Sequence, residues 1–115
     1  MKSMILYKKW DIILVPFPFT DLSAAKKRPA IVVSPDEYNT GLDIVIAFIT
    51  SKMDIKARFG DYFIREWKEA NLPKPSMIRM KFVTIDKTII VKQFGRLSNK
   101  DINDFKKELS NFFTK

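Results

Sequence analysis

The fold of this chain is decided by residues 12–33, IILVPFPFTDLSAAKKRPAIVV. The apolar run at each end predicts a strand, and the polar residues 20–25 between them have the composition of an exposed loop. Pro16 and Pro18 fix φ and lack backbone donors, so the first strand should stop pairing there or lie at a sheet edge. The stretch therefore predicts two strands joined by a loop.

Three positive charges, Lys26, Lys27 and Arg28, end the loop directly before Pro29. A residue that precedes proline is biased toward extended backbone, so Arg28 should be extended where the loop re-enters a strand. A basic side chain fixed at such a junction is a candidate anion site. A solvated basic turn explains the same residues, and composition alone favours that simpler interpretation.

The whole chain has the size and charge of one small basic domain. Its 115 residues, 46% of them apolar, are enough for one core, and we expect a single domain over residues 1–115. The net charge of +8 favours a polyanionic partner such as nucleic acid or an anionic membrane surface. The longest proline-free apolar run, Ile44 to Ile49, is far below the ~18 residues that span a bilayer, so we expect no membrane segment.

The chain contains neither cysteine nor histidine. Disulfides, thiolate metal sites, cysteine nucleophiles and Ser-His-Asp triads are therefore excluded. The pair Asp36-Glu37 has no visible partner carboxylate, so we expect no dedicated metal site. A chain without cysteine suits a reducing compartment, and the first residues lack a signal-peptide pattern, so we expect a cytoplasmic protein.

Apolar patterning predicts a mainly β chain. The expected strands cover residues 10–15, 30–34, 43–49, 59–64, 76–83 and part of 89–97, with turns at 35–41 and 84–88 and a short helix at 65–70. The run at 43–49 is continuous, which is typical of a strand covered on both faces. Several short strands of this kind predict a small antiparallel barrel or sandwich.

From Ser98 onward the apolar period becomes helical. Ile102, Phe105, Leu109 and Phe112 fall on one face of a helix, and a stripe of this kind is typical of core packing. Ser98 can cap the first turn, with an acidic residue three positions on. The sequence therefore predicts that the β domain ends in one long helix.

Two groups of residues outside the basic loop end could also take part in chemistry. Thr50 and Ser51 follow the apolar strand, although a threonine hydroxyl there more often satisfies the backbone. Arg79 and Lys81 should share one face of a strand, which is either solvated or functional. Asp21 could accept a proton, but an Asp in a loop more often bonds its own backbone. These residues indicate a basic β-rich domain that could bind nucleic acid, and by themselves they do not reveal an enzyme.

Four motifs in order resemble the MazF/PemK family of bacterial toxins. They are Trp10–Asp21 followed by Lys27–Ala30, the strand end Ile49-Thr50-Ser51, Pro75-Ser76 before a strand with Arg79, and Phe94-Gly95-Arg96-Leu97-Ser98 before the last helix. The match covers nearly the whole chain. The resemblance implies a mainly β fold, a small SH3-like barrel of the type shared by MazF and the gyrase poison CcdB, with a C-terminal helix. It also implies a homodimer.

The resemblance implies an activity as well. Members of the family are ribosome-independent endoribonucleases that cut single-stranded mRNA at short sequences without a metal or another cofactor. Their products typically carry a 2′,3′-cyclic phosphate and a 5′-hydroxyl, and the cuts inhibit translation and growth. A cognate antitoxin would neutralise such a toxin by laying an acidic, partly disordered segment over the RNA groove.

The resemblance assigns roles to single residues. Arg28 matches the family's catalytic arginine and Thr50 its catalytic threonine, which together would stabilise charge on the phosphate that is attacked. The residues that we expect to bind RNA are Lys26, Lys27, Ser51, Arg79 and Lys81. The resemblance also leads us to interpret Pro16 and Pro18 as the hinge of a mobile loop that gates RNA.

The proton-transfer step is open at this stage. Some family members place a carboxylate just after the arginine that matches Arg79, whereas this chain has Met80, Lys81 and Phe82. Either Asp21 takes that role, or the reaction depends on positioning and the two donors alone. Two other functions are also open: a non-enzymatic toxin that binds a protein target such as gyrase, as CcdB does, and a plain nucleic-acid-binding domain.

Overall fold

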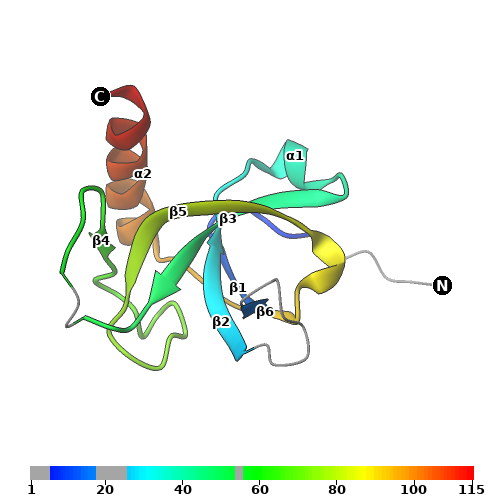
Figure 1. Ribbon diagram of the computed structural model, residues 1–115, viewed down its shortest axis with the longest axis horizontal. Helices are drawn as coiled ribbons and strands as arrows, with labels where there is room; N and C mark the ends of the chain where they lie inside the picture. Colours follow the sequence, from blue (N-terminus) through cyan, green and yellow to red (C-terminus); the bar gives the residue numbers. More distant parts are fainter. Residues whose placement is uncertain (1–5, 18–25, 54–55) are drawn as a thin grey trace.

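The protein is described by a computed structural model that covers residues 6–17, 26–53 and 56–115 (Figure 1). Its elements, in chain order, are β1 (Asp11–Phe17), β2 (Lys26–Val32), α1 (Asp36–Asn39), β3 (Asp43–Thr50), β4 (Tyr62–Phe63), β5 (Met77–Asp86), the 3-10 helix η2 (Lys87–Ile89), β6 (Lys92–Arg96) and α2 (Asn99–Thr114). The prediction of short strands followed by one long helix is confirmed.

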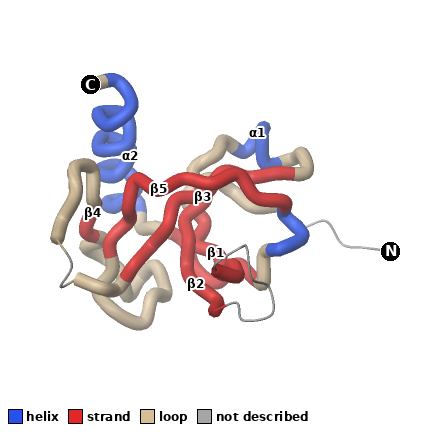
Figure 2. Tube along the Cα trace, in the orientation of Figure 1, coloured by secondary structure: helices blue, strands red, loops and turns tan. Residues whose placement is uncertain are grey.

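The six strands form one antiparallel sheet in the order β4-β5-β3-β2-β1-β6. The sheet curls into a half-barrel, with the long strand β5 arching over β3 (Figure 2). Apolar residues of β1, β2 and β3 are wholly buried, among them Ile12, Ile31 and Ile46. The predicted fold class, mainly β with a C-terminal helix, is confirmed.

Pro16 lies within β1, at a position where the sheet tolerates a proline. We predicted that Pro16 either stops the first strand or lies at an edge, and the second alternative holds. β1 continues to Phe17, with Pro16 opposite Lys27, but β6 pairs with β1 only as far as Leu14. Pro16 therefore lies where β1 has one neighbour, and a missing N–H there leaves no broken ladder. The interpretation of the two prolines as a hinge stays a prediction, because Pro16 is paired in β1 and Pro18 lies outside the described residues.

Several predicted boundaries are wrong for local reasons. Residues 35–41 hold the one-turn helix α1, and residues 65–70 form turns that end at Asn71, which has a left-handed φ of 67°. The turn predicted at 84–88 is the end of β5 followed by η2, because Asp86 accepts hydrogen bonds from the Thr88 N–H and hydroxyl and caps that 3-10 turn. These hydrogen bonds hold the pKa of Asp86 below its usual value.

Helix α2 closes one end of the half-barrel. Its cap is the one predicted, since Ser98 Oγ accepts a hydrogen bond of 3.2 Å from the Asp101 N–H. Phe105 is wholly buried and meets the Trp10 ring edge-on, with the centroids 5.7 Å apart. The predicted stripe is confirmed, because Ile102 and Phe105 are buried and Leu109 and Phe112 are half-buried.

A buried carboxylate joins α2 to the segment around β4. Asp101 is wholly buried and accepts hydrogen bonds from the Tyr62 hydroxyl, from the Arg65 N–H at 3.0 Å and from the Glu66 N–H at 2.8 Å. Burial, followed by the contact with this carboxylate, raises the pKa of the Tyr62 phenol. The start of α2 is therefore fixed to the chain just after β4.

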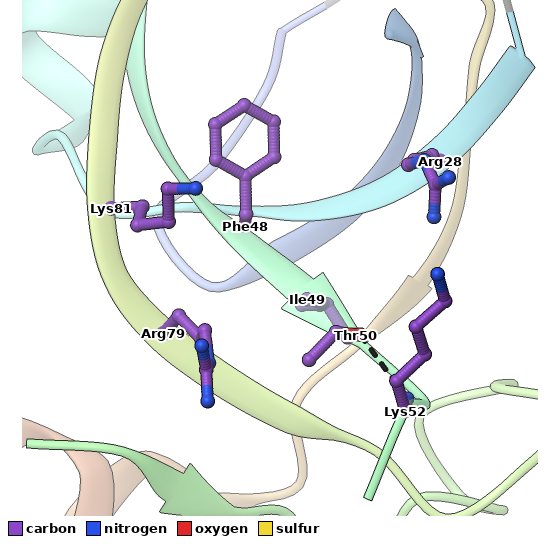
Figure 3. Close-up of a pocket in the computed structure, with 7 residues that line it drawn as sticks. All are labelled: Arg28, Phe48, Ile49, Thr50, Lys52, Arg79 and Lys81. Carbon is purple, nitrogen blue, oxygen red and sulfur yellow. Dashed lines mark hydrogen bonds between the residues drawn. The ribbon is translucent and has the colours of Figure 1, made fainter. Parts of the chain in front are cut away.

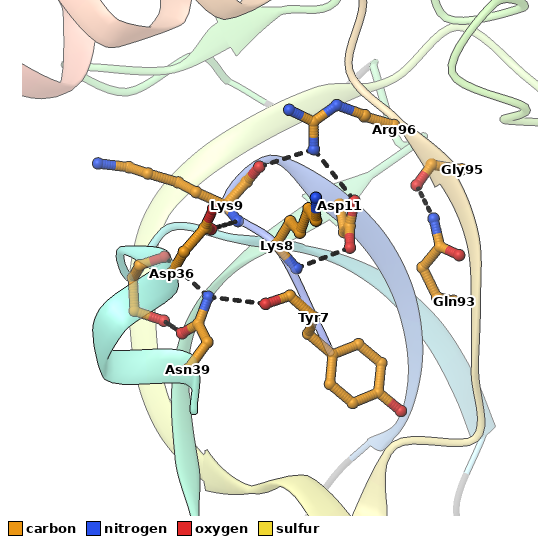
Figure 4. A network of polar contacts seen from close by, with 10 residues as sticks. Tyr7, Lys8, Lys9, Asp11, Asp36, Asn39, Gln93, Gly95 and Arg96 are labelled. Carbon is orange, nitrogen blue, oxygen red and sulfur yellow. Dashed lines mark hydrogen bonds and ion pairs between the residues drawn. The ribbon is translucent and has the colours of Figure 1, made fainter. Parts of the chain in front are cut away.

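A second polar network ties the turn before β1 to β6 and to α1 (Figure 4). Asp11 accepts a hydrogen bond of 2.8 Å from the Lys8 N–H and pairs with Arg96 of β6 at 3.2 Å. Asp36 of α1 accepts a bond of 2.9 Å from the Lys9 N–H. Asp11 thus has a structural role.

None of the helices in the described part of the chain is long and apolar enough to cross a membrane.

Candidate functional site

A pocket of about 260 Å³ opens where β2 and β3 separate and β5 passes beside them (Figure 3). Its lining is formed by Arg28 of β2, by Phe48, Ile49 and Thr50 of β3, by Lys52 just after β3, and by Arg79 and Lys81 of β5. Four of the seven side chains are cationic and none is a carboxylate. A pocket with this lining is suited to an anion.

The register of the sheet brings Arg28 to Thr50. β2 and β3 run antiparallel with Ala30 opposite Phe48, so two further residues along each strand place Arg28 across from Thr50. Pairing between the two strands stops at Ala30, directly after Pro29, which has no N–H to donate. The strands therefore part at this point, and the space between them becomes the pocket. Arg28 is in a strand, as predicted.

An irregularity in β5 presents its two basic residues to the pocket. Ala47 pairs with Phe82 and Ile49 with Ile78, so four steps along β5 match two steps along β3. The extra residues lie opposite Phe48 and bend β5. Arg79 and Lys81 both line the pocket, so the prediction that they share a face is confirmed.

The two basic residues of β5 differ sharply in their surroundings. Lys81 is exposed, whereas the Arg79 side chain is 8% exposed and its Nη2 pairs with Asp61 at 3.1 Å. The same Nη2 donates a hydrogen bond of 3.1 Å to the Lys56 carbonyl. The Arg79 guanidinium therefore holds the segment before β4 against β5, while Lys81 keeps its charge at the surface.

Thr50 has its hydroxyl oriented by the chain that follows it. Its Oγ1 accepts a hydrogen bond of 3.1 Å from the Lys52 N–H. A threonine hydroxyl at the end of a strand commonly satisfies a backbone group in this way. A hydroxyl that accepts one bond still has its own proton to donate. Among the described residues, no hydrogen bond uses Thr50 as the donor. The backbone bond thus leaves a positioned O–H at the pocket wall.

Lys52 and Phe48 are site residues that the sequence did not reveal. Figure 3 shows the Lys52 and Arg28 side chains extending toward one another across the pocket. Lys52 had a signal, because a residue two positions after a strand-end threonine can fold back over it in a turn. Phe48 was hidden in a run interpreted as covered on both faces, but Val45, Phe48 and Thr50 are only half-buried. Ile44 and Ile46 on one face of β3, and Ala47 and Ile49 on the other, are nevertheless buried. The interpretation is therefore confirmed for most of the strand, and the cover is incomplete at Phe48 and Thr50, where β3 reaches the pocket.

The other predicted residues lie apart from the pocket lining or outside the described chain. Lys26 and Lys27 are exposed at the start of β2, and Ser51 is exposed next to Thr50. Asp21 lies outside the described residues. Within the part of the chain that the structure describes, no three carboxylates come together in a way that could hold a metal ion.

Comparison with known proteins points to one family. The family model described as PemK-like, MazF-like toxin of type II toxin–antitoxin system matches residues 8–113. No curated protein matches the chain in sequence. The Deinococcus radiodurans MazF structure is 16% identical with a TM-score of 0.71, covering 97% of this chain and 100% of that one.

Two mycobacterial structures have the same fold. An endoribonuclease in complex with its cognate antitoxin, from a Mycobacterial species, is 14% identical with a TM-score of 0.71, covering 96% of this chain and 95% of its own. Mycobacterium tuberculosis toxin MazF-mt6 is 17% identical with a TM-score of 0.71, covering 90% of this chain and 95% of its own.

Proposed function

Because the chain belongs to the family of PemK-like, MazF-like toxins of type II toxin–antitoxin systems, we propose that it is an endoribonuclease that cleaves single-stranded mRNA and thereby inhibits translation and growth. The observation that carries the proposal is the convergence of Arg28, Thr50 and Lys52 on one pocket without a carboxylate in its lining. A phosphodiester is the anion that such a pocket suits in a toxin of this family.

The reaction is a transfer within the RNA strand. The 2′-OH oxygen attacks the adjacent phosphorus and loses its proton, while the bond from phosphorus to the 5′-oxygen of the next nucleotide breaks and that oxygen gains a proton. The products are a 2′,3′-cyclic phosphate and a 5′-hydroxyl. Negative charge accumulates on the two non-bridging oxygens, so donors fixed at those oxygens lower the barrier.

Arg28 and Thr50 supply such donors. The guanidinium of Arg28 offers a planar fork that fits two phosphate oxygens, and Lys52 adds a second cation from the opposite side. The Thr50 O–H, oriented by the Lys52 N–H, donates a third contact. An arginine guanidinium holds its proton too strongly to act as an effective general base, so we assign Arg28 to charge stabilisation. We assign the same cations the charge compensation that a metal ion would otherwise supply.

The proton acceptor is the part of the mechanism with the fewest candidates. Asp21 is the residue proposed for proton transfer, and it lies outside the described residues. The pocket lining contains neither a carboxylate nor a histidine that could accept the proton. We therefore attribute most of the rate enhancement to positioning and to the donors of Arg28 and Thr50, with Asp21 as the candidate base.

The proposed partners follow from the charge of the site and from the family. One relative of the same fold is an endoribonuclease in complex with its cognate antitoxin. We propose that this toxin forms a homodimer and that its own antitoxin presents an acidic, partly disordered segment to the cationic pocket. A messenger RNA substrate places this function in the cytoplasm.

Cleavage of single-stranded RNA in the presence of a chelator tests the proposal. Wild-type protein should cleave, and Arg28→Ala should lose turnover. Arg65→Ala is the matched control, because that guanidinium is exposed and pairs only loosely with Asp104, at 3.9 Å. No cleavage by the wild type, or equal cleavage by Arg28→Ala, would overturn the catalytic assignment. Inhibition of gyrase supercoiling with intact RNA would instead support a CcdB-like toxin.

A further inference from the structure

A second pocket adjoins the first and has a different character. It has a volume of about 80 Å³ and shares Arg79 and Lys81 with the first pocket. Its remaining lining is largely apolar and aromatic, with one further cation: Arg58, Phe59, Asp61, Met80 and Phe112. In Figure 1, α2 and β4 lie beside the end of the sheet where β3 stops, which is the side from which these residues come. The two pockets are therefore neighbours, with the β5 residues Arg79 and Lys81 lining both.

The aromatic component of this surface is open to solvent. Phe59 is 60% exposed, and its ring lies at an interplanar angle of 31° to the half-buried Phe112, with the centroids 6.1 Å apart. Phe112 in turn packs against Phe82 and Phe113. Phe59 therefore has a supported inner side and an open outer side, which is the arrangement of a stacking platform.

The backbone holds Phe59 in this place. Gly60 has a φ of +90°, and a Cβ there would lie 2.7 Å from Met80 Cγ, so only glycine allows the chain to pass so close to β5. Asp61, directly after Gly60, accepts a hydrogen bond of 2.7 Å from the Arg58 N–H, directly before Phe59. Asp61 also pairs with Arg79 of β5. An exposed phenylalanine on a turn fixed at three points is preorganised, and ligand binding to it costs little ordering entropy.

We propose that this second pocket is a binding site for an unpaired nucleobase, which stacks on Phe59 while a phosphate of the same strand occupies the Arg28–Thr50 pocket. A cavity of 80 Å³ cannot enclose a base, so the base lies on the open face of the ring at the mouth of the pocket. Base stacking on aromatic side chains beside a cationic groove is how proteins bind single strands.

The surrounding charge selects a nucleic acid over an apolar partner. Arg58 and Lys81, both exposed, border the aromatic surface, while Asp61 is neutralised by Arg79. A second copy of this chain would bring the same cations against them, whereas a phosphodiester backbone would be attracted. The inference rests on the proposed function, because the base belongs to the strand that the first pocket holds.

The test measures binding to two single-stranded DNA probes of equal length, one of randomised sequence and one fully abasic. Neither has a 2′-OH, so neither is cleaved by the proposed reaction. Phe59→Ala should weaken binding of the base-containing strand by roughly 5- to 100-fold and leave the abasic strand unchanged. Phe59→Trp should retain the affinity. Phe63→Ala is the control, because Phe63 is 50% exposed and lines neither pocket.

The outcomes separate this inference from the proposed function. If wild-type protein cleaves RNA but Phe59→Ala binds both probes as Phe63→Ala does, the stacking site is wrong and the endoribonuclease stands. If Phe59→Ala alters sedimentation but not affinity for the base-containing strand, the face belongs to a second copy and the inference is overturned. If the wild type neither binds the probes nor cleaves RNA, the proposed function fails first.

Discussion

The Thr50 hydroxyl combines a structural contact with a proposed role in the reaction. Its oxygen accepts the Lys52 N–H at 3.1 Å, which holds the oxygen in place and leaves its own proton to donate. A residue that only terminated the strand would be replaceable by any side chain that keeps the turn. A residue that donates to the transition state would not be, because the donor acts on charge that develops during the reaction.

Replacing Thr50 by valine should therefore lower the single-turnover cleavage rate by about 10²- to 10³-fold, since the donor is lost together with the acceptor for the Lys52 N–H, while the side-chain volume is kept. Thr50→Ser should stay close to the wild-type rate. Thr84→Val is the matched control, because Thr84 is an exposed threonine of β5 that does not line the pocket. Equal rates for the valine and serine variants would show that the hydroxyl has no chemical role.

The basic residues in and near the pocket should differ in how much they contribute to RNA binding and to turnover. Removing Lys52, which lines the pocket, should weaken RNA binding and reduce the slope of log affinity against log salt by about 0.7. Lys26→Ala or Lys27→Ala should weaken binding modestly, because both side chains are exposed outside the lining, and Arg28→Ala should abolish turnover. Equal losses of cleavage activity in the Lys26, Lys27 and Arg28 variants would show that these residues act only as an electrostatic patch.

At the scale of elements, β5 depends on a buried ion pair. Asp61 and Arg79 are 3% and 8% exposed at the side chain and 3.1 Å apart. Asp61→Ala should lower the free energy of unfolding by about 3–5 kcal/mol, because it leaves a buried guanidinium without its counter-charge. Asp104→Ala, which breaks the exposed pair with Arg65, should cost under about 1 kcal/mol. Denaturant unfolding measures both, and equal costs would contradict the structural role of Arg79.

The contact between Tyr62 and Asp101 should appear in the pH dependence of stability. The folded state holds the pKa of Tyr62 above the ordinary value of 10.0, so folding favours the neutral phenol. That stabilisation is complete below pH 10 and is lost as the pH rises above it, because the unfolded chain then releases a proton that the folded chain retains. Tyr62→Phe should flatten the decline above pH 10, whereas exposed Tyr38→Phe should not. Parallel curves for wild type and Tyr62→Phe would contradict this.

The elements that could be predicted from sequence are those set by local pattern. Helix α2 was recognisable because its period, cap and apolar stripe agree. Residues 65–70 were not, since the good helix formers there make only turns that end at Asn71 in the left-handed region, and Asp101 fixes the first of these turns through the Arg65 and Glu66 N–H groups. The length of β5 was also missed, because Thr84 and Asp86 are exposed polar residues. At this end of the strand β5 pairs with β3 but not with β4.

At the scale of the whole molecule, the site is a product of the curled sheet. Arg28, Thr50 and Arg79 come from three strands, and the motifs of the family indicated them one at a time. What the motifs could not give is the spatial relation: the opening after Pro29, the commitment of Arg79 to Asp61 and the approach of Lys52. These depend on register and on a bulge, which are non-local. The net charge of +8 indicated a polyanion without locating where it binds.

The most direct test of the central claim is a comparison of two RNA strands that differ at one atom. A strand cleaved by the wild type in a chelator is resynthesised with a single 2′-deoxy nucleotide at the cleaved position. We predict that the parent gives a 2′,3′-cyclic phosphate and a 5′-hydroxyl, and that the deoxy strand is not cut at that position. Cleavage of the deoxy strand at the same position, with a 5′-phosphate on the product, would contradict attack by the 2′-OH in the Arg28–Thr50 pocket.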